Sequence, residues 1–191
     1  MTRVDDQALR QIFLEARTLR TWQPRAVPDS LLHEIVTLAL LGPTASNSLP
    51  ARFVFVRSAE AKERLKPHLD AGNVGRTMSA PVTAIVAHDL RLYAKRPRGH
   101  KAIEGLVKPE RAEASALRNG SLQGAYLLLA ARALGLDCGP MGGFNNAGVD
   151  KEFFAGTETK SNFLCNLGYG DRTGLKPRAE RFGFDEVASI L

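Results

Sequence analysis

Three uncharged polar residues, with the chemistry to bind a planar hydrogen-bonding ring, lie between an apolar helical pattern and an apolar strand pattern. They are Thr44, Ser46 and Asn47, and they follow Gly42 and Pro43. The asparagine amide both donates and accepts hydrogen bonds, and the small neighbouring residues allow the backbone to approach a ligand closely. The same residue types also suit an ordinary helix-to-strand loop. The run therefore predicts a loop and leaves open whether that loop binds a ligand.

A compact basic group ends the first helical pattern. Arg17, Thr18 and Arg20 place two guanidinium groups and a hydroxyl within four residues, which suits a phosphate or the polar edge of a ring. Two solvated arginines are the alternative. A second basic group near the C-terminus contains Lys176, Arg178 and Arg181.

A glycine-rich stretch is the third candidate. Pro140, Met141, Gly142 and Gly143 follow Gly135 and Gly139 and predict a loop that can direct backbone N–H groups at a ligand. The patterns GxGxxG and GxxxxGK[ST] are both absent, so a phosphate loop of those classes is not expected. Taken alone, this stretch does not identify its ligand.

Hydrophobic periodicity predicts the elements that would position these residues. We expect helices over residues 5–16, 29–41, 59–66, 110–134 and 185–191, and buried strands over 53–56, 81–89 and 163–169. Residues 71–80 are predicted to be a loop, and residues 90–109 a flexible lid or an insertion. In the long helix, Gly120 and Gly124 would let another helix approach closely, in the middle of the domain or of a dimer.

The composition is that of a globular protein. The chain has 191 residues, of which 44% are hydrophobic and 24% charged, so we expect one domain over residues 1–191. A signal peptide and a membrane-length apolar run are both missing, which predicts a soluble, cytoplasmic protein. Cys138 and Cys165 have no metal-ligand spacing and are expected to be reduced, buried thiols.

The net charge of +6 raises the possibility of nucleic-acid binding. The densest basic segment, residues 91–101, contains one aromatic residue, Tyr93, and no nucleic-acid-binding motif. A solvated surface segment is favoured, and neither a nucleic acid nor a membrane is expected as a partner. The positive balance also suits a protein that binds phosphate-bearing cofactors.

Four segments together resemble the FMN-dependent nitroreductase family in their order and spacing. They read ARTLR, GPTASNSLPARFVF, GLDCGPMGGF, and NLGYGD followed by KPRAER. The similarity spans nearly the whole chain and is greatest to the short branch that contains malonic semialdehyde reductase. It implies an α+β fold: a three-layer α/β/α sandwich with a mixed sheet flanked by helices and a long central helix at a homodimer interface.

The resemblance also implies the cofactor and its ligands. FMN would receive a hydride at N5 from NADH or NADPH and pass it to a small-molecule acceptor in a ping-pong reaction. Arg17, Thr18 and Arg20 match the motif for the phosphate and the pyrimidine edge. Arg178 and Arg181 match the basic pair on the phosphate, with Lys176 as a further candidate. Thr44, Ser46 and Asn47 match a segment inserted by the partner subunit, and residues 140–143 match the loop facing N5.

Two departures from the family pattern concern the acceptor. Ala51 and Arg52 follow Pro50 where many members have an aromatic residue, and Gly142 replaces a glutamate. Malonic semialdehyde, reduced to 3-hydroxypropionate, is the expected acceptor, with Arg52 either pairing with its carboxylate or facing solvent. Quinone or nitroaromatic reduction is an alternative, and a non-catalytic basic binding domain is another. The four histidines are expected to be structural, because a flavin carries the hydride chemistry itself.

Overall fold

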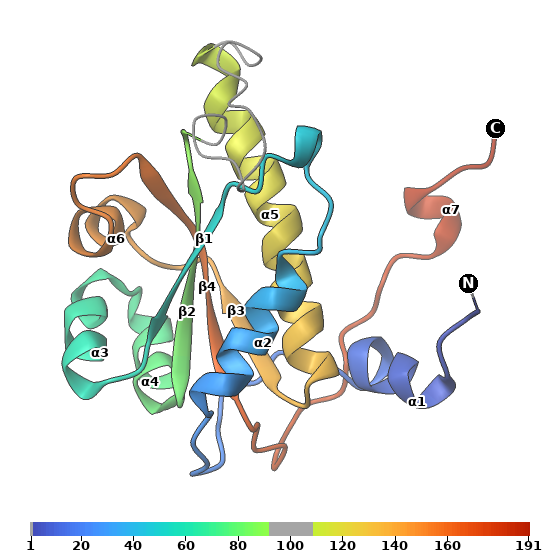
Figure 1. Ribbon diagram of the computed structural model, residues 1–191. Coiled ribbons are helices and arrows are strands. Elements are labelled where there is room, and N and C mark those ends of the chain that lie inside the picture. Colours follow the sequence, from blue (N-terminus) through green and yellow to red (C-terminus); the bar gives the residue numbers. More distant parts are fainter. Residues whose placement is uncertain (1, 92–108) are drawn as a thin grey trace.

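The computed structural model describes residues 2–91 and 109–191, which form three layers (Figure 1). A four-stranded sheet lies between α2 and α5 on one face and α3, α4 and α6 on the other. The strands are β1 (Ala51–Val56), β2 (Val82–Asp89), β3 (Asp137–Met141) and β4 (Thr159–Gly168), in the order β1-β2-β4-β3. The helices are α1 (Asp6–Leu9), α2 (Asp29–Ala39), α3 (Ala59–Leu65), α4 (Ala71–Ser79), α5 (Pro109–Ala133), α6 (Asn146–Phe153) and α7 (Phe184–Val187). The expected α+β sandwich is confirmed.

Pairing within the sheet is antiparallel for β1 with β2, β2 with β4 and β3 with β4. The four-stranded sheet is therefore antiparallel rather than mixed as expected. An isolated parallel bridge between Thr18 and Cys138 adds to the outer edge of β3. All eight residues of β2 are buried, because helices cover both faces of the sheet. Burial on both faces fits the apolar residues 84–87, Ala-Ile-Val-Ala, in the middle of this strand.

Side chains of alternate strand residues enter two separate cores. On the α2 and α5 side, Ala84 packs with Ile35 and Leu127. On the other side, Ile85 packs with Leu65 of α3 and other apolar residues of that layer. The period-two alternation of the strands therefore supports a helical layer on each face.

Gly120 and Gly124 allow α5 to lie directly on the sheet. A Cβ atom on Gly120 would lie 2.8 Å from the Cβ of His88, and one on Gly124 would lie 2.8 Å from the Phe163 ring. The expectation that these glycines admit a second helix is therefore wrong, since strand residues occupy the space. The reason is that the glycines share the buried face of α5 with Ala116, Leu127 and Ala131.

Two segments expected to be loops are regular elements. Residues 71–79 form α4, despite Gly72 and Gly75, and Asn73 anchors the helix by donating to the carbonyl oxygen of Gly143 at 2.6 Å. Residues 137–141 form β3 because their backbone pairs with β4. Helix α6 was not anticipated from the sequence.

The ends of the chain also differ from expectation. The first helix passes from α1 into a π-helical turn, Arg10–Leu14, in which the N–H of Glu15 donates to the carbonyl oxygen of Arg10. The last helix is confined to Phe184–Val187. Most of the predicted lid over residues 90–109 lies outside the described residues. Cys138 and Cys165 are free and buried, as expected.

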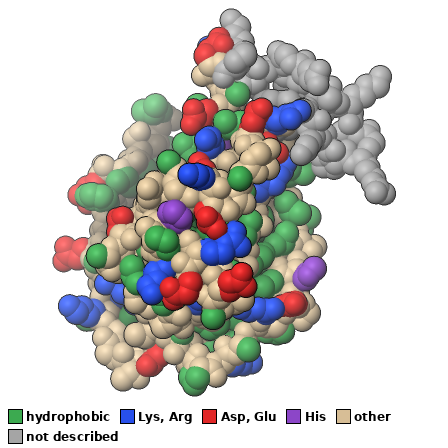
Figure 2. Space-filling view, turned by 90° about the vertical axis from the view of Figure 1, so that its left-hand side faces the viewer, with side chains coloured by type: hydrophobic (Ala, Val, Ile, Leu, Met, Phe, Trp, Pro, Cys, Tyr) green, Lys and Arg blue, Asp and Glu red, His purple; other side chains and the backbone are tan. Residues whose placement is uncertain are grey.

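The outer face formed by α3, α4 and α6 carries basic and acidic side chains in alternation (Figure 2). Arg64 pairs with Glu152 at 2.6 Å, and Lys66 pairs with Glu63 at 3.1 Å. The visible face is thus a mixed-charge surface of the kind that water solvates well.

Over residues 2–91 and 109–191, no helix has the length and apolar content needed to cross a membrane.

The contact between α5 and the sheet leads to a stability prediction. We expect Gly120→Ala to lower the free energy of unfolding by about 1–3 kcal/mol, because the added methyl would meet the Cβ of His88. Gly75→Ala in α4 is the matched control: it has no heavy atom within 4 Å of the new Cβ. That control should gain about 0.5–1 kcal/mol from helix propensity. Urea unfolding of both variants checks the pair, and equal shifts would contradict the proposed packing.

Candidate functional site

The segment that carries Arg17, Thr18 and Arg20 runs along the outer edge of β3. The backbone N–H of Leu19 donates to the carbonyl oxygen of Cys138 at 3.0 Å. Leu19 is only 1% exposed, while Thr18 and Arg20 on either side of it are exposed. A buried leucine thus anchors the segment, and alternation turns the two polar side chains outward.

Close approach of this segment to β3 depends on Gly139. A Cβ atom at Gly139 would lie 2.6 Å from the carbonyl oxygen of Leu19, closer than any real contact. Glycine at this position therefore has a packing reason that the sequence could not reveal. It brings residues 17–20 beside the stretch 140–143, so two of the predicted site segments are neighbours.

A cavity of about 490 Å³ forms where the C-terminal segment meets residues 17–21. The N–H of Asp171 donates to the carbonyl oxygen of Thr21 at 3.0 Å, and Arg17 donates to the carbonyl oxygen of Lys176 at 2.7 Å. Four residues predicted from the sequence line this one cavity: Arg17, Thr18, Arg20 and Lys176.

The electrostatics of this cavity favour an anion. Arg17, Arg20 and Lys176 contribute positive charges, and Asp171 contributes a negative one. Hydrogen bonds from the backbone and side chain of Thr173 lower the pKa of Asp171, so its carboxylate stays ionised. The balance of charge is positive, and Thr18 adds a hydroxyl group able to donate to an anion.

Helix α4 brings two further polar residues to the same side of the sheet. Burial, and then the nearby charge of Arg20, lower the pKa of Arg76. Two guanidinium groups held near each other attract an anionic or electron-rich ligand. Asn73, one turn earlier, binds the carbonyl oxygen of Gly143. Sequence analysis missed both residues because it predicted residues 71–80 to be a loop.

Residues 140–143 present an uncrowded backbone edge. No heavy atom lies within 4 Å of the position that a Cβ would take on Gly142, which is exposed. On Gly143, by contrast, a Cβ would lie 2.6 Å from the side chains of Asn73 and Asp70. Pro140 and Met141 belong to β3, and the Thr77 hydroxyl lies 3.5 Å from the Met141 sulfur. The backbone is therefore packed against α4 and its N-cap at Gly143 and is unobstructed at Gly142.

Thr44, Ser46 and Asn47 lie elsewhere in the chain. Their loop contains a short 3₁₀ turn, Ala45–Asn47, and the N–H of Ala45 donates to Asn119 in the first half of α5. The first helix instead contacts the other end of α5, where Gln11 donates to the carbonyl oxygen of Arg132. At 1.5 Å per residue, α5 rises roughly 20 Å from Asn119 to Arg132. Within one chain, the loop with Thr44, Ser46 and Asn47 is therefore near one end of α5, and the first helix, which leads into residues 17–20, is near the other (Figure 1).

Arg178 and Arg181 do not line the cavity. The guanidinium of Arg178 donates to the carbonyl oxygens of Phe13, Leu14 and Ala16, where the first helix ends. Arg181 donates to the carbonyl oxygens of Ala179 and Glu180 in its own segment. In this arrangement Arg178 ties the C-terminal segment to the first helix.

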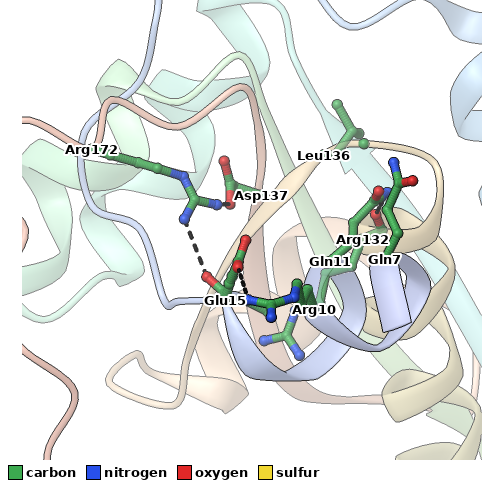
Figure 3. A pocket seen from close by; sticks show the side chains of 10 residues that line it. Gln7, Arg10, Gln11, Glu15, Arg132, Leu136, Asp137 and Arg172 are labelled. Carbon is green, nitrogen blue, oxygen red and sulfur yellow. Dashed lines mark hydrogen bonds and ion pairs between the residues drawn. The ribbon is translucent and has the colours of Figure 1, made fainter. Parts of the chain in front are cut away.

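A second cavity, of about 540 Å³, lies between the first helix and the end of α5 (Figure 3). Its arginines already have partners: Arg10 pairs with Glu15 at 3.3 Å, and Arg172 pairs with Asp137 at 2.6 Å. Arg132 donates to the carbonyl oxygen of Ile12. Two carboxylates inside this cavity make it a poorer anion site than the one lined by Arg17 and Lys176. Among the described residues, no cluster of His, Cys, Asp or Glu has the makings of a metal site.

Known proteins similar to this chain identify its family. The model of the nitroreductase family matches residues 14–169. A Burkholderia lata protein provisionally named NADH dehydrogenase/NAD(P)H nitroreductase is 55% identical over 194 residues, covering 100% of both chains. A Stenotrophomonas maltophilia protein of the same provisional name is 56% identical over 192 residues, covering 98% of this chain and 97% of its own.

A solved structure shares the fold. It is a provisionally named nitroreductase from Exiguobacterium sibiricum in complex with FMN, which aligns with a TM-score of 0.85 at 22% identity. The alignment covers 100% of this chain and 99% of the other. Taken together with the match over residues 14–169, these similarities show that the chain belongs to the nitroreductase family.

Proposed function

We propose that this chain is an FMN-dependent oxidoreductase that takes its electrons from NADH or NADPH. The observation that carries the proposal is the convergence of Arg17, Thr18, Arg20 and Lys176 on one cavity beside the open edge at Gly142. The names of the two relatives above 50% identity support a nicotinamide reductant. The FMN complex of the Exiguobacterium sibiricum protein supports the flavin.

The residues present suit FMN. Arg17 and Lys176 would neutralise the phosphate, and the Thr18 hydroxyl would donate to it. Arg20 and Arg76 would lie toward the polar edge of the ring, where a guanidinium binds carbonyl oxygens well. The missing side chain of Gly142 would let a flat ring approach the backbone, whose N–H groups favour negative charge on that ring. Bound FMN supplies the hydride transfer between nicotinamide and acceptor.

A second copy of the chain would complete this site as a homodimer. Residues 172–191, here called the C-terminal arm, are all exposed, and Phe182, Phe184 and Ile190 are 76%, 59% and 89% exposed. Apolar side chains arrayed along an extended arm need a surface to cover them. Helix α5 also exposes Leu122 and Tyr126. A dimer would cover these groups and bring the Asn47 loop of one copy to the cavity of the other.

The acceptor is a small electrophile that reaches the open face at Gly142. Two features expected to favour malonic semialdehyde are not available to it: Ala51 is 5% exposed, and Arg52 binds Asp89 at 2.8 Å. The cationic cavity margin remains as support for a carboxylate-bearing aldehyde. The names of the relatives favour nitro compounds. Nitro compounds and quinones alike need only an accessible flavin face. Family membership leaves the non-catalytic basic domain without support.

The cavity leads to a prediction about FMN affinity. Arg17→Ala should weaken FMN binding about ten- to a hundredfold, because a charge-assisted hydrogen bond to the phosphate is lost. Arg10→Ala is the matched control, since Arg10 lines the second cavity and already pairs with Glu15. Fluorescence titration of apoprotein measures both constants. Equal affinities for Arg17→Ala and wild type would show that Arg17 does not bind the phosphate. Arg178→Ala and Arg181→Ala, measured in the same titration, test whether those two arginines bind it instead.

The separation of the two predicted segments leads to a prediction about subunits. Neither Asn47→Ala nor Arg17→Ala homodimers should retain an intact site, whereas a heterodimer of the two variants should regain one site per dimer. Differently tagged subunits, co-expressed and purified by both tags, provide the heterodimer for FMN stoichiometry and turnover. Two impaired sites in that heterodimer would show that both residues serve the same chain's site.

The engagement of Arg52 leads to a prediction about the acceptor. A benzoquinone or a nitroaromatic compound should have a kcat/KM at least about tenfold above that of malonic semialdehyde, because no free side chain on β1 binds the carboxylate of the aldehyde. Steady-state rates with the same reductant measure the ratio. A higher value for malonic semialdehyde would restore the aldehyde as the physiological class of acceptor.

A further inference from the structure

The loop that carries Asn47 has an unusual backbone. Ser46, Asn47 and Leu49 have φ angles of 52°, 52° and 45°, in the left-handed region that side chains other than glycine seldom adopt. Three such residues within four positions are unfavourable unless surrounding contacts hold them. The conformation of this loop therefore depends on its contacts with the rest of the molecule.

A buried asparagine of α5 holds the start of the loop. The Oδ1 atom of Asn119 accepts a hydrogen bond of 2.8 Å from the N–H of Ala45. Its Nδ2 atom donates to the carbonyl oxygen of Ser115 at 2.8 Å, which fixes the orientation of the amide. Asn119 is 3% exposed. Both ends of its amide are thus bonded, and its acceptor is directed at the loop.

The end of the loop is held by different groups. The N–H of Ala51 donates to Oε1 of Gln123 at 3.0 Å, one turn further along α5. Arg52 donates to the carbonyl oxygens of Leu49, Pro50 and Ala51. These bonds fix the junction with β1. The bond of Asn119 acts at the other end of the loop, because Ala45 immediately precedes Ser46 and Asn47.

Asn119 contributes little to the helix that contains it. Asparagine is a weaker helix former than leucine, and burying its amide has a desolvation cost that only good hydrogen bonds offset. The long-range bond that it makes is to Ala45, 74 positions away in the sequence. The polar residue at this buried position therefore stabilises the loop rather than the helix.

We propose that Asn119 is a positioning residue for the flavin site. Through the N–H of Ala45 it holds the Thr44–Asn47 segment, in which Ser46 and Asn47 have a left-handed backbone, in the conformation that presents Asn47 to the FMN of the partner copy. This inference rests on the proposed function. It predicts that Asn119 and Asn47 act as one unit in FMN binding, although Asn119 does not touch the cofactor.

A double-mutant cycle tests this proposal. Asn119→Leu keeps the size and apolar packing of the side chain and removes the acceptor for Ala45. In the wild-type background it should weaken FMN binding about tenfold. In the Asn47→Ala background the same change should alter the dissociation constant by less than about twofold, since the loop no longer presents the amide. Asn119→Ala serves as the second variant if leucine prevents folding.

Ser121→Ala is the matched control for this cycle. Ser121 lies on the same helix and accepts a hydrogen bond of 2.9 Å from Asn162, away from the loop. Its loss should lower the melting temperature while leaving FMN affinity unchanged. Equal losses from Asn119→Leu in both backgrounds, or no loss in the wild-type background, would overturn the proposal. Failure of wild-type protein to bind FMN would instead refute the proposed function, and the inference with it.

Discussion

The close contact between α5 and the sheet at Gly120 and Gly124 is the constraint on which the rest of the molecule depends. Because strand side chains occupy the space where Cβ atoms would lie, the rotation of α5 about its axis is fixed. That rotation directs Asn119 and Gln123 toward the loop and the start of β1, and it leaves Leu122 and Tyr126 facing outward. One helix thus sets the sheet contact, the loop conformation and an exposed apolar strip.

The candidate site is consequently divided within a single chain. Residues 17–20 and 171–176 form a cationic cavity at the outer edge of β3, and the asparagine loop belongs to the first half of α5. Within one chain, roughly 20 Å of α5 separates the contact of the loop at Asn119 from the contact of the first helix at Arg132. This separation is the reason for proposing sites shared between two copies, in which each copy would give a loop and receive one.

The sequence predicted those features that depend on local pattern. Strong periodicity located β2, β4 and the long helix. Features that depend on distant partners were missed. Residues 71–79 were predicted to be a loop because Gly72 and Gly75 weaken a helical pattern, yet they form α4. Strand β3 was missed because it is defined by its pairing with β4 and with the segment at Leu19. The engagement of Arg52 with Asp89 likewise depends on register between strands, which no local pattern encodes.

The walls of the cationic cavity come from distant parts of the sequence. The Thr21 hydroxyl donates to the carbonyl oxygen of Asp171, 150 positions away, and Arg17 donates to that of Lys176, 159 positions away. Contacts between residues so far apart have a high loop-closure cost until the intervening chain has folded. The sheet, whose last strand ends at Gly168, must therefore pair before the cavity can close. During refolding we expect the cavity to form late, after the scaffold that holds its two walls.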